Sequence, residues 1–153
     1  MTIPTIIPAR PADLPTIHTM IRALSAFHGD TAQITIAHLQ DVFFGASPQA
    51  IALIARMGKD IVGYAGLTQT IVIHEGTQSL DIQHLFVSET HRAKGIGTAL
   101  IRAAQQHAHS CGATRLTIGT DPRNAAAIRA YRAMPMLTEK TNGGPQFSVD
   151  LNH

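Results

Sequence analysis

The chain contains one cysteine, few charged residues and no long apolar run, and each shortage excludes a class of protein. Cys111 is the only cysteine in 153 residues, so neither an internal disulfide nor a cysteine-based metal cluster can form. Charged residues make up 14% of the sequence, the formal net charge is only +2, and no basic run alternates with aromatics, so we expect no nucleic-acid partner. No apolar stretch is long enough to cross a bilayer, and residues 1–8 do not resemble a signal peptide. We therefore expect a cytoplasmic protein without membrane attachment.

The nine histidines do not form a metal-binding pattern. The sequence has no H-E-x-x-H motif and no cysteine partner for a histidine site. His107 and His109 are the most closely spaced pair, and two positions apart on a helix they face different directions. We expect no metal site.

The length and the spacing of apolar residues predict a single α/β or α+β domain over residues 1–153. The hydrophobic fraction of 44% suits a globular protein, and no repeat or linker divides the chain. Period-two and helical spacing predict the element order β-α-α-β-β-β-α-β-α-β-β. The expected strands are residues 3–8, 50–56, 61–73, 79–87, 115–119, 136–138 and 147–151, and the expected helices are 13–27, 35–45, 96–111 and 124–134.

The segment from Arg92 to Gly97 has the composition of an anion-binding loop. It follows an apolar strand that ends at Val87 and it begins a helix. Glycines allow backbone N–H groups to approach an anion closely, and a helix N-terminus adds free N–H groups and a positive dipole end. The third glycine of a dinucleotide fingerprint is replaced by Leu100, and the Gly-Lys-Ser/Thr of a Walker loop is absent. The loop therefore predicts a pyrophosphate site of another kind.

The R-x-x-G-x-G pattern after a strand resembles the acetyl-CoA loop of the GNAT N-acetyltransferase superfamily. The resemblance implies a mixed central sheet flanked by helices, which splays after its fourth strand to admit acetyl-CoA. It also implies that the backbone groups of Leu85, Phe86 and Val87 pair with the pantetheine arm, and that one N–H polarises the thioester carbonyl. The remaining cofactor contacts that it implies are Arg92, Ala93, Lys94, Gly95, Ile96, Gly97 and Thr98.

A second segment, from Asn124 to Tyr131, is similar to the N-x-x-A-x-x-x-Y motif of the same family. By this resemblance Asn124 contacts the cofactor and Tyr131 is a catalytic residue near the thioester sulfur. A phenol with a pKa of about 10 holds the proton that a thiolate with a pKa of about 8.5 needs on leaving. Two alternatives stay open: Asn124 as only a helix N-cap, and Tyr131 as only a core ring. The family's Gly-Phe pair is replaced by Pro135-Met136, so the exit of this helix departs from the pattern.

The strand before the loop supplies the candidates for a general base. Strict alternation places Asp81 and Gln83 on one face of the strand and His84 on the other. Asp81 is the only acid on its face and is our first candidate. His84 titrates nearer neutrality and is the better base by pKa, so a bulge that shifted the register would reverse the assignment. Gln83 cannot act as a base, and we expect it to contact the acceptor.

The acceptor implied by the resemblance is a small primary amine. The N-terminal half is loosely similar to the diamine and polyamine acetyltransferases, whose dicationic substrates require carboxylates. Asp30 and Asp41 are the acids near the expected acceptor loop, and we expect Asp30 to bind the substrate. Two alternatives are a non-catalytic acyl-CoA-binding module and a peptide or protein N-acetyltransferase. Members of the family often pair, so a homodimer is also expected.

Overall fold

The computed structural model describes residues 3–140 and 144–151, and the chain divides into two compact units, Met1–Gly119 and Thr120–His153. The first unit holds one five-stranded sheet with the strand order β1-β2-β3-β4-β5. Its strands are β1 (Thr5–Pro8), β2 (Ala50–Met57), β3 (Asp60–Val72), β4 (Thr77–Val87) and β5 (Arg115–Ile118). Its helices are α1 (Leu14–Phe27), α2 (Ile36–Phe44) and α3 (Ile96–Ser110), and the helix of the second unit is α4 (Ala125–Arg132).

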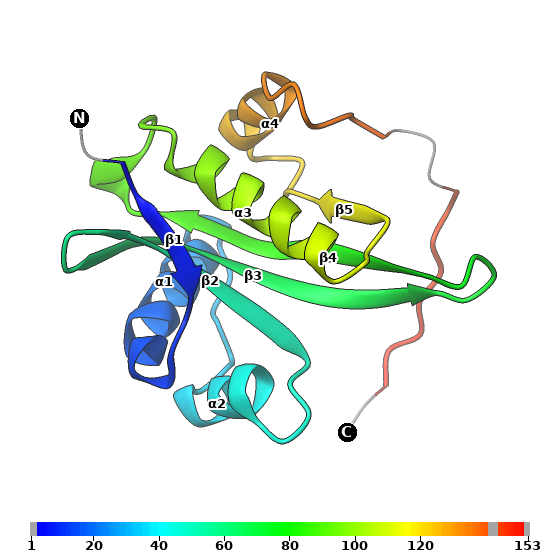
Figure 1. Cartoon of the computed structure of the whole chain (residues 1–153), viewed down its shortest axis with the longest axis horizontal. Coiled ribbons are helices and arrows are strands. Elements are labelled where there is room, and N and C mark those ends of the chain that lie inside the picture. Colours follow the sequence, from blue (N-terminus) through cyan, green and yellow to red (C-terminus); the bar gives the residue numbers. More distant parts are fainter. Residues whose placement is uncertain (1–2, 141–143, 152–153) are drawn as a thin grey trace. The chain divides into compact units, whose positions relative to one another are not determined.

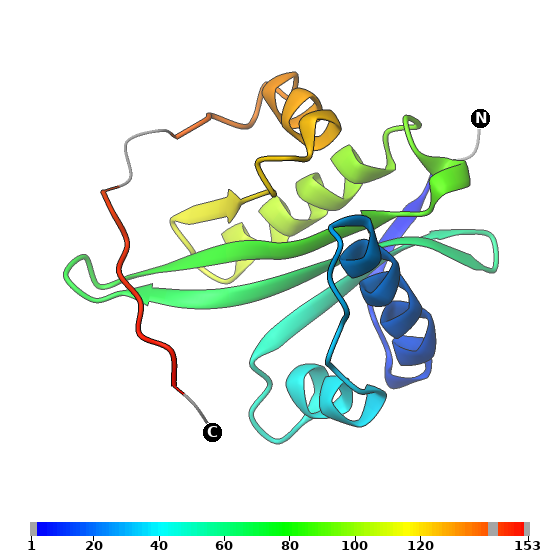
Figure 2. The same ribbon diagram turned by 180° about the vertical axis from the view of Figure 1, so that it is seen from behind.

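The sheet of the first unit is mixed and covered on both faces. Strands β1 to β4 pair antiparallel with their neighbours, and β5 pairs parallel with β4. Figures 1 and 2, seen from opposite sides, show α3 over one face and α1 with α2 over the other. Apolar side chains from the strands are buried against both layers, so the sheet is the centre of a two-sided core.

Helical spacing explains how these helices cover the sheet. On α1, Leu14, Ile17 and Ile21 are buried at intervals of three and four residues. On α3, Leu100 and Ala104 are buried four residues apart, on the opposite face of the sheet. The apolar spacing in the sequence thus orients both helices toward the sheet.

Local capping fixes the starts of two helices. The Thr35 hydroxyl accepts a hydrogen bond from the His38 N–H at 3.1 Å and begins α2. Asn124 does the same for α4, accepting from the Ala127 N–H at 3.1 Å. No helix of the described residues is long and apolar enough to cross a membrane.

The expected order of elements is confirmed from β1 through α4, and the two last strands are a correction. Residues 136–138 begin in a turn and continue without regular structure, and residues 144–151 form no strand. A strand requires a neighbouring backbone, and no described strand pairs with residues 144–151. The alternating side chains of Phe147, Val149 and Leu151 are exposed instead of buried against a helix layer.

Candidate active site

A β-bulge at Gln83 reorganises the face of β4. Gly66 of β3 pairs with His84, and the next residue, Leu67, pairs with Ile82, so Gln83 is an extra residue in β4. Thr68 pairs with Asp81 two positions from Gly66. Directly opposed residues share a face, so Asp81 and His84 are on the same face of the sheet. The opposite faces expected from strict alternation are therefore wrong for this pair, and the bulge is the reason.

The bulge also marks the point where β4 and β5 separate. Their parallel pairing ends with Ile82 opposite Ile118, and the extra residue Gln83 follows at once. A bulge bends its strand, and β4 continues beyond it to Val87, whereas β5 ends at Ile118. Beyond Ile82, the described strands pair with β4 on its β3 side alone.

The open edge of β4 presents the backbone groups of alternate residues. The Ser88 N–H donates to the Val62 carbonyl at 2.8 Å, which fixes this pair as a hydrogen-bonded one. In an antiparallel ladder such pairs alternate, so Phe86 bonds to β3 while Leu85 and Val87 direct their N–H and C=O groups to the open edge. Both backbone groups of Leu85 and the N–H of Val87 are therefore directed to the open edge, where an extended ligand can bind, and those of Phe86 are not.

The loop after β4 has the backbone of an anion cradle. Ala93 and Gly95 both take left-handed conformations, with φ of 60° and 83°. Gly95 is the N-cap of α3, and the Ala99 N–H donates to its carbonyl at 3.0 Å. The N–H groups of the first helical turn precede that bond and have no carbonyl partner four residues earlier within the helix. A side chain at Gly97 would meet only Val87 Cγ2, at 4.0 Å, so this turn is open to a ligand.

Arg92 ties this loop to the end of β4. Its Nε donates to the Val87 carbonyl at 3.0 Å, and its guanidinium lies 5.8 Å from the centre of the Phe86 ring. Lys94, two residues further on, is exposed. Two positive charges therefore flank the cradle, next to the open edge of the strand.

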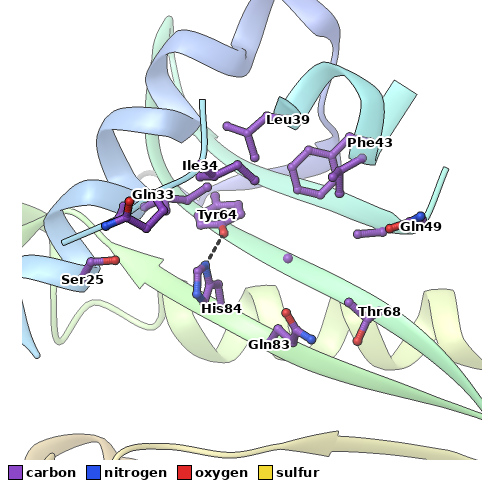
Figure 3. Close-up of a pocket in the computed structure, with 15 residues that line it drawn as sticks. Ser25, Gln33, Ile34, Leu39, Phe43, Gln49, Tyr64, Thr68, Gln83 and His84 are labelled. Carbon is purple, nitrogen blue, oxygen red and sulfur yellow. Dashed lines mark hydrogen bonds between the residues drawn. The ribbon is translucent and has the colours of Figure 1, made fainter. Parts of the chain in front are cut away.

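A cavity of about 470 Å³ lies on the α1 and α2 face of the sheet, and Figure 3 shows the side chains around it. The loop before α2 and α2 itself contribute one wall, and β3 and β4 contribute the other. The lining residues are Ile21, Ser25, Ala32, Gln33, Ile34, Leu39, Val42, Phe43, Gln49, Ala50, Tyr64, Gly66, Thr68, Gln83 and His84. Because His84 precedes Leu85, the cavity adjoins the open edge of β4.

Tyr64 and His84 form a hydrogen-bonded pair in this cavity. The Tyr64 hydroxyl oxygen is 2.9 Å from His84 Nδ1 (Figure 3). Burial raises the pKa of the Tyr64 hydroxyl well above its usual range, so it stays protonated. Burial, followed by the charge of His28, lowers the pKa of His84 below its ordinary value. His84 is therefore neutral at pH 7 and able to accept a proton.

Of the three polar residues expected at the acceptor site, Asp81 and Asp30 do not line the cavity. Asp81 is on the cavity face of the sheet, but its carboxylate accepts a hydrogen bond from Thr117 Oγ1 at 2.6 Å and is not among the lining residues. Asp30 is exposed after α1 and does not line the cavity. Gln83 does line it.

Asn124 and Tyr131 belong to the second unit. The Asn124 carboxamide caps α4, as one of the two interpretations of the sequence expected. Tyr131 is half-buried on α4, and burial raises the pKa of its hydroxyl. Its phenol therefore holds its proton at neutral pH.

The sheet, the loop and the second motif together match a known family. The model of the Acetyltransferase (GNAT) family matches residues 17–134, which is more than half of the chain. The chain belongs to this family. The match begins within α1, continues through α4 and includes the loop before α3.

Curated relatives of this GNAT chain are acetyltransferases. It is 32% identical over 107 residues to N-acetyltransferase 8B of Rattus norvegicus, covering 70% of this chain and 46% of that protein. It is 37% identical over 75 residues to the streptothricin acetyltransferase of Streptomyces lavendulae, covering 49% of this chain and 38% of that one. The chain thus spans less than half the length of these relatives.

Solved structures share the GNAT fold. An aminoglycoside acetyltransferase from an uncultured soil metagenomic sample, in complex with sisomicin, has a TM-score of 0.79 at 19% identity and covers 96% of this chain and 97% of its own. A probable acetyltransferase has a TM-score of 0.81 at 14% identity, with 97% and 99% covered. At such identities the likeness concerns the fold alone.

No sequence motif indicates several of the cavity residues in this GNAT domain. Tyr64 lies in the apolar run of β3, where an aromatic side chain is expected to be a core residue. The hydrogen-bond partner of its hydroxyl, His84, is twenty positions away on β4. Gln33 and Gln49 lie in connections between elements, without a motif. The structure shows why residue 66 is a glycine, because a Cβ there would lie 3.3 Å from the Tyr64 hydroxyl.

Proposed function

We propose that the protein is an acetyl-CoA-dependent N-acetyltransferase that acetylates a primary amine of a small molecule by direct attack. Family membership supports the class of reaction. The observation that carries the proposal is the meeting of two features at residues 84 and 85: the cavity with its His84 base, and the open edge of β4. An amine in the cavity would face an acyl group held along that edge.

The residues of the first unit suit the donor. The unpaired N–H groups of Leu85 and Val87 would hold the pantetheine arm, and one of them would polarise the thioester carbonyl. The left-handed loop and the first turn of α3, with Arg92 and Lys94 beside them, would hold the pyrophosphate. Acetyl-CoA would supply the acetyl group as a thioester. Asn124 would add a contact from the second unit, beside its role as a cap.

His84 is the group we propose to receive the proton of the attacking amine. At pH 7, deprotonating an alkylammonium of pKa about 10.4 costs on the order of 4 to 5 kcal/mol, so a base must share the proton. In the tautomer with hydrogen on Nδ1, Nε2 is free to accept. After protonation the Nδ1–H donates to the Tyr64 hydroxyl oxygen, which stabilises the imidazolium. Asp81, bonded to Thr117, would act only through water.

The departing sulfur requires a proton as the new carbon–nitrogen bond forms and the carbon–sulfur bond breaks. We propose that the Tyr131 phenol supplies it, since its raised pKa keeps it protonated. The nitrogen loses its second proton as the amide forms, and this proton restores the Tyr131 phenol by way of solvent. The proton taken by His84 also returns to solvent, so the overall reaction converts the ammonium and the thioester into an amide, a thiol and one released proton.

The decisive experiment is CoA thiol release from acetyl-CoA with a panel of primary amines, after subtraction of the acceptor-free rate. We expect stimulated release and an acetylated product of the matching mass. His84→Gln should reduce the stimulated rate by about 100-fold. Acetyl-CoA binding with no stimulated release by any amine or short peptide would contradict the proposal and favour a non-catalytic acyl-CoA-binding module.

A further inference from the structure

The acceptor cavity is electrically neutral along its lining. Of the described residues that line it, none is an aspartate, glutamate, lysine or arginine. The ionisable groups in the lining are Tyr64 and His84, and both are in their neutral forms at pH 7. The cavity therefore offers hydrogen bonds but no full charge to a ligand.

The lining is divided into an apolar wall and a polar floor. Figure 3 shows Ile34, Leu39 and Phe43 on one side of the cavity, with Gln83 and His84 from β4 on the other. Leu39 is 1% exposed, so this wall is part of the core and not a mobile surface. An occupant would thus contact apolar atoms on one side and amide, hydroxyl and imidazole groups on the other.

The missing charges decide which amines are favoured. One ammonium can enter because it transfers its proton to His84 and becomes neutral. A second ammonium would remain charged, and removal of its hydration without a carboxylate partner is unfavourable. A carboxylate on the acceptor meets the same penalty, since no cation lines the cavity within the described chain.

The two acids that would suit a dication are elsewhere. Asp30 and Asp41 are exposed and outside the lining. Asp41 lies on α2, whose Leu39, Val42 and Phe43 face the cavity in its place. The loose similarity to diamine and polyamine acetyltransferases therefore has no counterpart in the charges of this cavity.

We propose that the acceptor is a monoamine with an uncharged, largely apolar body, and that the cavity selects against polyamines, aminoglycosides and free amino acids. This inference rests on the proposed function. The apolar body packs on Ile34, Leu39 and Phe43, and a neutral polar group on it bonds to glutamine side chains. The cavity volume of about 470 Å³ is within the range of single small-molecule sites.

Four six-carbon amines of nearly equal length test the charge rule directly. They are hexylamine, aminocaproamide, hexamethylenediamine and aminocaproate, which differ in whether the far end is apolar, neutral polar, cationic or anionic. We expect kcat/KM for the first two to exceed that for the last two by at least about tenfold. Equal or faster turnover of hexamethylenediamine or aminocaproate would overturn the inference while leaving the acetyltransferase activity established.

A negative charge introduced into the lining should change the preference of the cavity between the diamine and the monoamine. Gln49 lines the cavity just before β2, and Gln49→Glu adds a carboxylate of the same size. Because this side chain is exposed, we expect kcat/KM for hexamethylenediamine relative to hexylamine to rise only about threefold. Gln49→Ala is the matched control, which removes the amide without adding charge and should leave the ratio unchanged. An identical ratio in Gln49→Glu and Gln49→Ala would contradict the assignment of the far end of the acceptor to this cavity.

A binding measurement separates the inference from catalysis. Calorimetric titration with N-hexylacetamide, a neutral product, and with N-acetylhexamethylenediamine, its cationic counterpart, needs no turnover. We expect the neutral product to bind at least about tenfold more tightly. Tighter neutral binding without thiol release would support the selectivity and contradict the proposed function. Tighter binding of the cation would overturn the selectivity whatever the activity.

Discussion

His84 shows how a single residue combines position, protonation state and hydrogen bonding. Its side chain lines the cavity, its Nδ1 contacts the Tyr64 hydroxyl, and burial with the charge of His28 lowers its pKa. Burial and the charge of His28 favour the neutral base over the imidazolium in the resting protein, and the Tyr64 contact holds the ring in place. The residue is thus suited to accept a proton and to return it quickly.

The pH dependence of His84→Gln tests this role. The wild-type kcat/KM should fall as the pH decreases through the lowered pKa of His84, since the base becomes protonated. The variant depends on amine that is already deprotonated in solution, so its rate should rise with pH toward the amine pKa of about 10.4. The ratio of wild-type to variant kcat/KM should therefore shrink as the pH rises. A ratio that stays constant across the pH range would indicate a purely structural role.

Substitution of the loop glycines should change the stability of the protein and its affinity for CoA separately. Gly97→Ala adds a methyl group with only Val87 Cγ2 nearby, at 4.0 Å, and alanine favours the helix, so unfolding should cost about 0.5 kcal/mol more. The same methyl group would obstruct a pyrophosphate at the helix start, and we expect CoA affinity to fall about tenfold. Calorimetry with CoA and thermal unfolding measure the two effects.

Gly95→Ala is the contrasting control. Its φ of 83° is strained for alanine although the space is open, so stability should decrease by about 1 kcal/mol. Wild-type CoA affinity in Gly97→Ala would refute the placement of the pyrophosphate on the first turn of α3.

At the scale of elements, the bulge in β4 connects the two halves of the candidate site. The extra Gln83 directs His84 into the cavity face together with Asp81, and it follows the last pair between β4 and β5. One inserted residue therefore sets the position of the base and lies where the open edge of β4 begins.

Deletion of Gln83 should remove the bend without breaking the sheet. Ile82 and His84 already pair with successive residues of β3, Leu67 and Gly66, so a chain without Gln83 keeps regular alternation. We expect a folded protein by circular dichroism, and CoA affinity reduced about tenfold because β4 is no longer bent where its open edge begins. Gln83→Ala keeps the extra residue and should keep the affinity for CoA. A deletion variant that binds CoA like the wild type would show that the bulge does not open the edge.

The helices and most strands were predictable from sequence because their signals are local. The apolar spacing of α1 and the Thr35 cap of α2 depend on residues within a few positions of one another. The expected strand at residues 147–151 shows the limit of such signals. Its alternation of Phe147, Val149 and Leu151 is regular, but no described strand pairs with it. Alternation indicates what a strand would bury and does not supply its partner.

At the scale of the whole molecule, the division at residue 119 separates the cavity from the second motif. The first unit contains the complete sheet, both helix layers, the cradle and the cavity. Asn124 and Tyr131 are in the second unit. We propose that residues 1–153 work as a single N-acetyltransferase domain, in which the second unit contributes the proton donor.

A fragment of residues 1–119 should therefore fold and lack turnover. Its core is buried on both faces of the sheet, so we expect a single cooperative thermal transition. It should bind N-hexylacetamide through the cavity. Its rate of thiol release should be at least about 100-fold lower, because the fragment lacks Tyr131. Tyr131→Phe in the full chain is the matched comparison, since it removes only the hydroxyl. Full activity in either variant would refute the role of Tyr131.

Local sequence patterns were enough to predict the order of elements through α4, the glycine loop, the second motif and the family that they resemble. These features are encoded by neighbouring residues, whose spacing and side chains set the local backbone. Only the folded chain shows that His84 shares a face with Asp81, that the N–H groups of Leu85 and Val87 are directed to the open edge of β4, and that the cavity is lined without charge. Each of these depends on the pairing of β3 with β4 or on the packing of α2 against the sheet. Such contacts join residues far apart in the chain, and no local pattern records their register.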